Sequence, residues 1–235
     1  RQDDMLAMWP SVYPADTILD LFTYAGSPMT YSLNLGGGAG LWWRNGGFSI
    51  SANYVSGNAG NGVPAPAAGA AAGGVGTAAS ASTSTVQFGY AGNNWGLAAA
   101  YSYLQGPGNI QATNFLNFAL NAGNPGAPQS SNAFALSGYW QPSQSGWIPS
   151  ISAGWGIGTT NILGANGSSS GLVATSNSWT IGLQWSDAFV KGNALGMGFG
   201  QNTMVSKLSP NAQAAVGGAA PNDGNWAWEW WYKFQ

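Results

Sequence analysis

Charged residues are scarce in this chain. Only 5% of its 235 residues carry a charge, whereas a typical soluble domain has about 25%. A soluble surface with so little charge is poorly protected against association, but a surface that meets lipid does not need that protection. The net charge is −2, and nothing points to nucleic-acid binding, which needs a clustered basic patch.

Cysteine and histidine are absent altogether. Their absence removes disulfides and the thiolate and imidazole ligands of metal sites. It also removes the usual general base and the Ser–His and Cys–His nucleophile pairs. We therefore expect a protein that is not an enzyme and has no cofactor and no metal site. A barrel enzyme such as a lipase is only a minor alternative.

Long hydrophobic runs are also missing, although 45% of the residues are hydrophobic and 13% are aromatic. A membrane-spanning helix needs about 20 consecutive apolar residues, and no such run occurs. The nearest candidate, residues 63–79, consists mostly of Ala, Gly and Pro and is typical of a flexible loop. The composition therefore favours a β-barrel, the other structure that can cross a bilayer.

The chain does contain a clear alternation of apolar and polar residues, which is the pattern of strands with two different faces. In residues 95–104, Trp95, Leu97 and Tyr101 fall on one face, whereas Gly96 and Ser102 fall on the other. The pattern predicts about nine strands, at residues 34–44, 47–55, 85–90, 95–104, 133–140, 147–157, 179–186, 195–200 and 226–234. We expect an all-β fold, an antiparallel transmembrane β-barrel of the outer-membrane type. All 235 residues would belong to this one domain, with residues 1–33 as a loop or constriction segment and residues 34–235 as strands.

The connections between these strands differ in length. Short turns are predicted at residues 45–46, 93–94, 143–146 and 187–192, and long connections at residues 57–82, 105–131, 158–176 and 203–224. Short and long connections alternate along the chain. Outer-membrane barrels show this alternation, with short periplasmic turns and long external loops.

The few charges within the strands lie on the small, polar face. They are Arg44, Glu229 and Lys233. A soluble barrel shows the reverse arrangement, with apolar residues inside and charges outside. We therefore expect the apolar face to meet lipid and the polar face to line a pore. The candidate pore-lining residues are Arg44, Gln87, Gln184, Glu229, Lys233, Trp42 and Trp231. The last two break the alternation and point inward, which makes them candidates for stacking on a solute.

Residues before the first strand form an acidic segment, and the candidate constriction residues within it are Arg1, Asp3, Asp4, Asp16 and Asp20. Their spacing fits no EF-hand calcium loop, so a solvated loop and a cation-attracting constriction stay open. Glycine patterns at residues 36–40, 154–158 and 196–200 lack the helix and acidic partner of a dinucleotide site. They are interpreted as small residues on lumen-facing strands.

Three stretches, residues 31–43, 48–54 and 193–201, give the chain a family resemblance. The chain resembles the cyanobacterial outer-membrane porins, which are grouped with carbohydrate-selective porins and are often called iron-uptake porins. The resemblance covers nearly the whole chain. It implies the outer membrane of a Gram-negative-type bacterium, a cyanobacterium, and a barrel of about sixteen strands, within the even-numbered range of such barrels. It also implies an amino-terminal periplasmic anchoring domain, which is absent here, so we expect the sequence to be a piece of a longer protein.

These observations together predict a porin for the passive diffusion of small hydrophilic solutes and inorganic ions, with iron and sugars among the candidates. Its partners would be the lipid bilayer and these solutes. A homotrimer is one possible assembly because porins commonly form trimers, although no sequence feature specifies it. The alternative is a secreted or surface structural or adhesive β-protein without a pore, which a carbonate wash would release without detergent.

Overall fold

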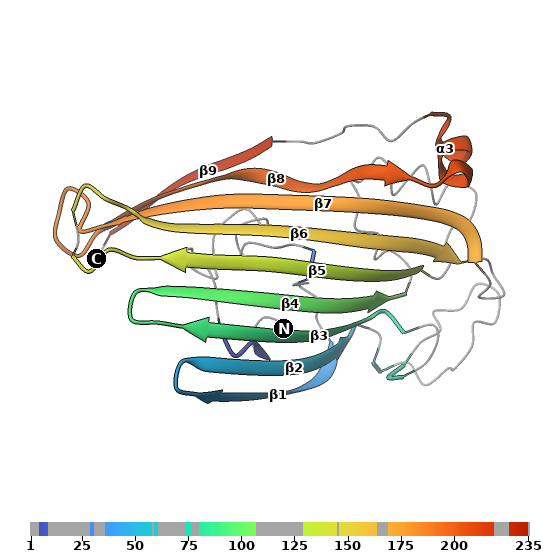
Figure 1. The fold of residues 1–235 in the computed structure, drawn as a ribbon, viewed down its shortest axis with the longest axis horizontal. Coiled ribbons are helices and arrows are strands. Elements are labelled where there is room, and N and C mark those ends of the chain that lie inside the picture. The colour runs from blue at the N-terminus through green and yellow to red at the C-terminus, as the bar shows by residue number, and fades with distance from the viewer. Residues whose placement is uncertain are drawn as a thin grey trace.

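A single antiparallel sheet dominates the computed structural model (Figure 1), which describes residues 5–8, 29–30, 36–57, 59–60, 74–76, 80–106, 129–144, 146–163, 169–218 and 226–234. The nine strands lie in the sheet in chain order. They are β1 (Gly37–Asn45), β2 (Phe48–Ser56), β3 (Ser82–Ala91), β4 (Trp95–Gln105), β5 (Gln129–Trp140), β6 (Ser150–Leu163), β7 (Ser169–Ser186), β8 (Ala194–Leu208) and β9 (Trp226–Lys233). The predicted all-β, antiparallel class is confirmed.

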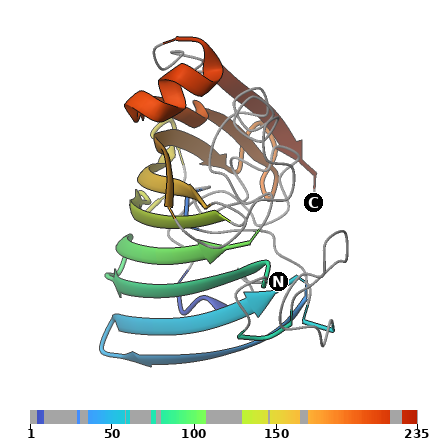
Figure 2. The same cartoon turned by 90° about the vertical axis from the view of Figure 1, so that its right-hand side faces the viewer.

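The sheet bends into an arc and leaves two edges (Figure 2). β1 and β9 lie at these edges, and within the described residues they do not pair with each other. The sheet therefore has a convex face and a concave face but is not closed into a barrel. No helix in the described part of the chain is long and apolar enough to cross a membrane.

Side chains alternate between the two faces as the sequence predicts. On β4 the pattern is regular, with Leu97 and Tyr101 exposed and Ala98, Ala100 and Ser102 buried. Cross-strand pairing keeps the same face throughout, since directly paired residues in antiparallel strands point to one side. Ala100, for example, pairs with Gln87 on β3 and is buried like it.

The β1–β2 hairpin turns one residue later than predicted. Asn45 pairs with Phe48, so the two loop residues are Gly46 and Gly47, with φ of 55° and 86°. Two successive residues with positive φ are typical of the type I′ turn, whose twist matches that of paired strands. The turn was predicted at residues 45–46, but only Gly adopts both of these φ values without strain.

Strands β6, β7 and β8 are longer than the sequence predicts. The predicted long connection at residues 158–176 shrinks to residues 164–168, because β6 continues to Leu163 and β7 begins at Ser169. The extensions pair directly, as Thr159 does with Thr175. The strict alternation of short and long connections therefore ends at β6–β7. The sequence signal is weak here because Thr, Asn and Ser occupy both faces, so no apolar alternation marks the strands.

A short helix follows β8 within the predicted long connection at residues 203–224. This helix, α3 (Pro210–Val216), begins after the N-cap Ser209 and ends at Gly217, whose φ is 80°. Ala212 is its buried residue and joins a small apolar cluster between the ends of β6, β7 and β8. The cluster consists of Ile162, Ala174, Val205, Leu208 and Ala212. It gives the extended strand ends a local core of their own.

Candidate functional site: the two faces of the sheet

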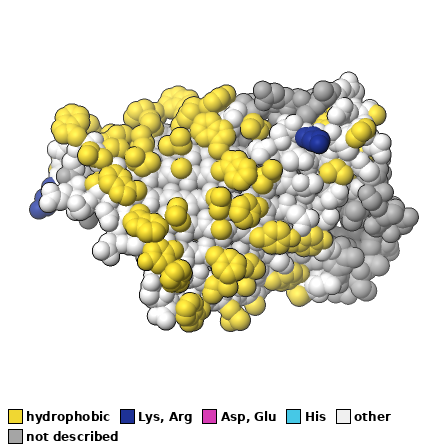
Figure 3. All heavy atoms as spheres, in the orientation of Figure 1, with side chains coloured by type: hydrophobic (Ala, Val, Ile, Leu, Met, Phe, Trp, Pro, Cys, Tyr) yellow, Lys and Arg dark blue, Asp and Glu magenta, His cyan; other side chains and the backbone are white. Residues whose placement is uncertain are grey.

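The convex face carries large apolar side chains that are exposed (Figure 3). They come from every strand, with Leu41 and Trp43 on β1, Phe88 on β3 and Trp228 on β9 among them. Soluble monomers rarely expose contiguous apolar patches larger than a few hundred Å². An apolar surface that extends over nine neighbouring strands is therefore suited to contact another apolar phase.

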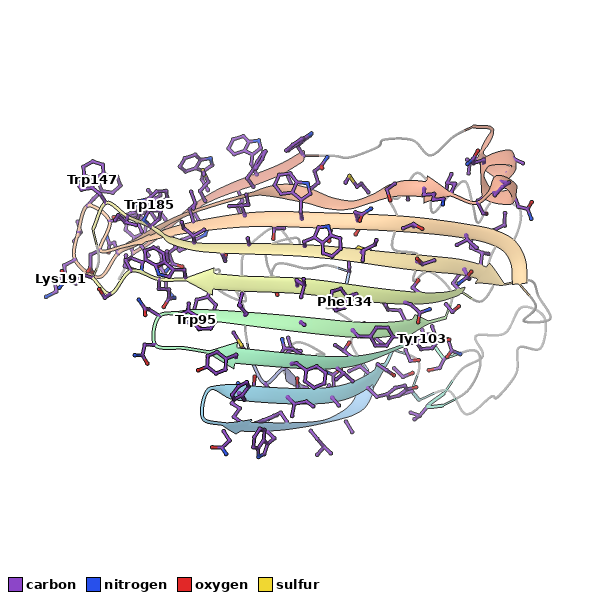
Figure 4. The ribbon with its side chains drawn as sticks, viewed as in Figure 1. Trp95, Tyr103, Phe134, Trp147, Trp185 and Lys191 are labelled. Carbon is purple, nitrogen blue, oxygen red and sulfur yellow. The ribbon has the colours of Figure 1, made fainter. Side chains whose placement is uncertain are left out.

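This apolar surface has a limited height along the strands. On β4 it runs from Trp95 to Tyr103, which is about 27 Å at about 3.4 Å per residue. Figure 4 shows Trp95, Trp147 and Trp185 towards the end with the short turns, and Tyr103 towards the opposite end. Aromatic residues at both ends of an apolar band are typical of barrels that span a bilayer.

The convex face becomes polar at the level of Tyr103 on the strands that follow β4. In the register of the sheet, the residues aligned with Tyr103 on β5 to β8 are Asn132, Thr159, Thr175 and Lys207. Lys207 falls within the predicted connection at residues 203–224, but it lies in β8 with its side chain exposed. A lysine at this level fits a band edge, since a long cationic side chain reaches towards water from the rim of an apolar surface.

The concave face has the opposite chemistry. One row of paired residues crosses the sheet from β2 to β7, and all of its members are small or polar and buried. The row consists of Ser51, Gln87, Ala100, Ala135, Gly156 and Ser178. The chain thus reverses the ordinary distribution, in which large apolar side chains are buried and polar ones are exposed.

Several polar groups on this face have no hydrogen-bonding partner among the described residues. They are the hydroxyls of Ser49, Ser51, Ser137, Ser176 and Ser178 and the side-chain amide of Asn53. Buried polar groups are almost always hydrogen-bonded, to protein or to water. These groups are buried without a protein partner among the described residues, and bound water commonly satisfies such groups.

The predicted pore residues of β1 lie together at one end of this face. Arg44 and Trp42 pair with Ser49 and Ser51, which belong to the buried side of β2. The Arg44 guanidinium carbon lies 5.2 Å from the centre of the Trp42 ring, within the range of a cation–π contact. The indole therefore already has a partner, which lowers its availability for stacking on a solute.

The two predicted glutamines differ in their surroundings. Gln87 is fully buried, and its side-chain amide is hydrogen-bonded in both directions to the backbone of Met8. Gln184 is half-buried and pairs with Gly196 near the turn end of β7. Gln87 thus binds another part of the chain, a role for which the sequence carries no signal.

The predicted residues of β9 follow the expected orientation. Glu229 is buried opposite Gly198, and Lys233 is exposed opposite Ala194. Trp231 pairs with Gly196, and a methyl group added to this glycine would overlap the indole ring. The ring therefore lies over the glycine on the concave side, inward as predicted. The structure does not bring β9 and β1 together, so their charges lie at opposite edges of the sheet.

The predicted constriction residues Arg1, Asp3, Asp4, Asp16 and Asp20 lie outside the described residues, and their role stays a prediction. Residues 5–8 and 29–30 of the same region are described, and we call these six residues the inner segment. They lie against the concave face, through contacts with β1, β3, β4 and β8. Sequence reasoning missed these contacts, although three of the five methionines of the chain lie before β1.

A cavity of about 490 Å³ lies beside the inner segment. Its lining includes Ala7 and Met8 of that segment, Arg44, Ser49 and Tyr139. The volume falls within the range of about 300–1,000 Å³ that is typical of small-molecule sites. A small polar solute would fit here next to the guanidinium group of Arg44.

Comparison of the chain with protein-family models, with curated proteins and with solved structures finds no match. Function is therefore inferred from the two faces of the sheet.

Proposed function

We propose that the sheet is part of an outer-membrane β-barrel that lets small hydrophilic solutes and inorganic ions diffuse passively. The observation that supports the proposal most strongly is the reversed distribution of side chains between the two faces. Exposed aromatic and aliphatic side chains cover the convex face, whereas small and polar residues, mainly Ser, Thr, Ala and Gly, cover the concave face. In such a barrel the apolar convex face would contact lipid, and the polar concave face would contact water.

The open edges add a requirement to this proposal. Within a bilayer every backbone N–H and C=O group needs a partner, so an open sheet edge cannot face lipid. β1 and β9 run in the same direction, because every neighbouring pair in the nine-stranded sheet is antiparallel. An antiparallel barrel that contains this sheet therefore has an odd number of further strands. The roughly sixteen strands that the family resemblance implies would meet this condition, within the even numbers known for such barrels.

The concave face also supports a channel of weak charge selectivity. Among the described residues, β2 to β8 place no charged side chain on the concave face, and the charged candidates Arg44, Glu229 and Lys233 lie on the edge strands β1 and β9. Selectivity in such pores comes from charged side chains and narrow points along the passage. Neutral solutes and ions of both signs would therefore pass, and membership of the cyanobacterial porins stays a prediction from the resemblance.

Conductance in a planar lipid bilayer tests the proposal directly. The full-length protein, purified in detergent and added to one side, is expected to produce stepwise increases in current, and the same detergent without protein none. A folded protein that gives no current would contradict the proposed function. Carbonate extraction of membranes separates the alternative, because an adhesive β-protein without a pore would be released into the wash, whereas a barrel would stay in the pellet.

A further inference from the structure

Glycines on the concave face form hollows that hold methionine side chains of the inner segment. A methyl group added to Gly89 on β3 would lie 2.7 Å from the sulfur of Met8, and one added to Gly40 on β1 would lie 2.8 Å from the sulfur of Met5. Distances below about 3.0 Å do not occur between real Cβ atoms and their neighbours. Each methionine therefore occupies space that exists only because the strand residue beneath it is glycine.

Gln87 adds directional contacts to this packing. The backbone N–H of Met8 donates to Oε1 of Gln87 at 3.2 Å, and Nε2 of Gln87 donates to the Met8 carbonyl oxygen at 3.0 Å. Gln87 is fully buried, and 8% of the Met8 surface is exposed. Because both contacts involve backbone atoms, this clamp fixes the position of the segment whatever side chain position 8 carries.

The second part of the inner segment extends across the concave hollow. The carbonyl oxygen of Thr30 accepts hydrogen bonds from Ser102 Oγ at 2.6 Å and from Thr85 Oγ1 at 3.3 Å. The sulfur of Met29 accepts a hydrogen bond from Thr203 Oγ1 on β8 at 3.6 Å. β4 and β8 are separated by three strands in the sheet, about 19 Å along the arc. Residues 29–30 thus link parts of the sheet that are distant from each other.

We propose that the inner segment is a channel-narrowing element that docks on the concave face through methionines in glycine hollows and through the Gln87 clamp. The inference depends on the proposed porin function, because only a conducting barrel has a passage to narrow. Its physical basis is separate from conductance, since the docking contacts are present whatever the protein transports.

A designed disulfide tests the docking. The chain has no cysteine, so the double variant Met8→Cys/Gly89→Cys contains the two new thiols alone. A Cβ atom at position 89 would lie 3.3 Å from Cβ of Met8, close to the range of about 3.5–4.5 Å for disulfides. With copper phenanthroline as oxidant, both thiols lose their hydrogens and one S–S bond forms within the membrane-inserted protein. Intact mass, measured before and after reduction, reports it.

A matched pair provides the control. In Met8→Cys/Thr180→Cys the second thiol lies on β7, four strands from β3 in the sheet order, or about 19 Å along the arc. We expect rapid disulfide formation with position 89 and none with position 180. Equal rates for the two pairs, or no disulfide with position 89 in folded protein, would overturn the docking.

Removal of the clamp tests the role of Gln87. Adding Gln87→Leu to the Met8→Cys/Gly89→Cys variant is expected to slow disulfide formation by about 5- to 100-fold, the factor that two hydrogen bonds represent. Gln184→Leu removes the same amide from another position on the concave face and is expected to leave the rate unchanged. Equal rates with and without Gln87 would remove it from the docking site.

Single-channel conductance then separates the inference from the function that it depends on. Gln87→Leu is expected to conduct more than the unsubstituted protein, whereas the oxidised Met8→Cys/Gly89→Cys variant is expected to keep the lower conductance. If Gln87→Leu slows the disulfide but conducts as before, the narrowing role is wrong. If no variant conducts at all, the porin function itself fails, while the disulfide rates still decide the docking.

Discussion

Leu136 and Ser137 are neighbours in β5, yet their side chains face opposite environments. Leu136 is 49% exposed on the convex face, and Ser137 is 6% exposed on the concave face. In a protein surrounded by water, the apolar residue of such a pair would be the buried one. These two adjacent residues therefore have the same reversed distribution of apolar and polar side chains as the whole sheet.

Leu136→Arg tests whether the convex face meets hydrocarbon. Leu136 lies between Phe134 and Trp140 on this face, within the apolar band. We expect the substitution to lower the free energy of unfolding in lipid vesicles by about 2–4 kcal/mol, the cost of a cation near the bilayer midplane. A urea titration of the inserted protein measures the change.

The control for this variant is Asn93→Arg, which adds the same charge in the exposed β3–β4 turn. We expect it to leave the unfolding midpoint almost unchanged. Equal small effects from both substitutions, within about 0.5 kcal/mol as for ordinary surface changes, would mean that Leu136 faces water.

Glu229 is the one glutamate of the chain, and it is buried on the concave side of β9. If ions pass along this face, its negative charge attracts cations. Glu229→Gln is expected to lower the permeability of potassium relative to chloride, measured as a shift of the reversal potential in a potassium chloride gradient. Asp187→Asn removes an equal charge from the β7–β8 turn and is expected to give no shift. Equal shifts would show that Glu229 does not face the passage.

At the scale of the elements, Ser209 connects α3 to the beginning of β7. Its hydroxyl oxygen accepts from the backbone N–H of Ala212 at 3.3 Å and from that of Val173 at 3.0 Å. The same hydroxyl donates to the Gly171 carbonyl oxygen at 2.7 Å. One side chain thus caps the helix and also ties it to the sheet.

Ser209→Ala is expected to loosen α3 and to leave the centre of the sheet intact. Loss of an N-cap costs about 0.5–2 kcal/mol, which predicts amide hydrogen exchange up to about 30-fold faster in residues 211–216. Hydrogen–deuterium exchange with peptide resolution measures it, and Ala214→Ser, at an exposed helix position, is the control. Faster exchange throughout the sheet would show that α3 supports the whole fold.

The sequence predicts best those elements whose two faces differ most. β4 and β5 have large apolar side chains on one face and Ala, Ser or Gly on the other, so the period of two is visible in the residues themselves. The ends of β6 and β7 have Thr, Ser and Asn on both faces. Their strand structure comes from mutual pairing and from the cluster beneath α3, and neither is visible in a local pattern.

The candidate site could be predicted only in part, for a related physical reason. Alternation alone places Glu229 and Trp231 on the polar face. The fit of Met8 to Gly89 joins residues 81 positions apart, and a glycine that leaves space for a distant side chain looks like any other strand glycine. The clamp between Gln87 and the Met8 backbone leaves no sequence signal at all, because it does not depend on the identity of residue 8.

At the scale of the whole molecule, the arc of nine strands separates two surfaces that need different solvents. The convex surface is apolar over a band of limited height, and the concave surface is polar and holds the inner segment. These features together, with two open edges that require pairing, make the arc suited to a closed wall between lipid and water. Neither surface alone would support that conclusion.

The most direct test is a spin-label scan along β5. Single cysteines placed in turn at positions 132–138 of this cysteine-free chain are labelled with a nitroxide, and the protein is inserted into lipid vesicles. Relaxation by molecular oxygen, which concentrates in hydrocarbon, is measured at each position by electron paramagnetic resonance. We predict maxima at positions 134 and 136 and minima at positions 133, 135 and 137. Uniformly low relaxation by oxygen, or maxima at the positions of the concave face, would contradict the account.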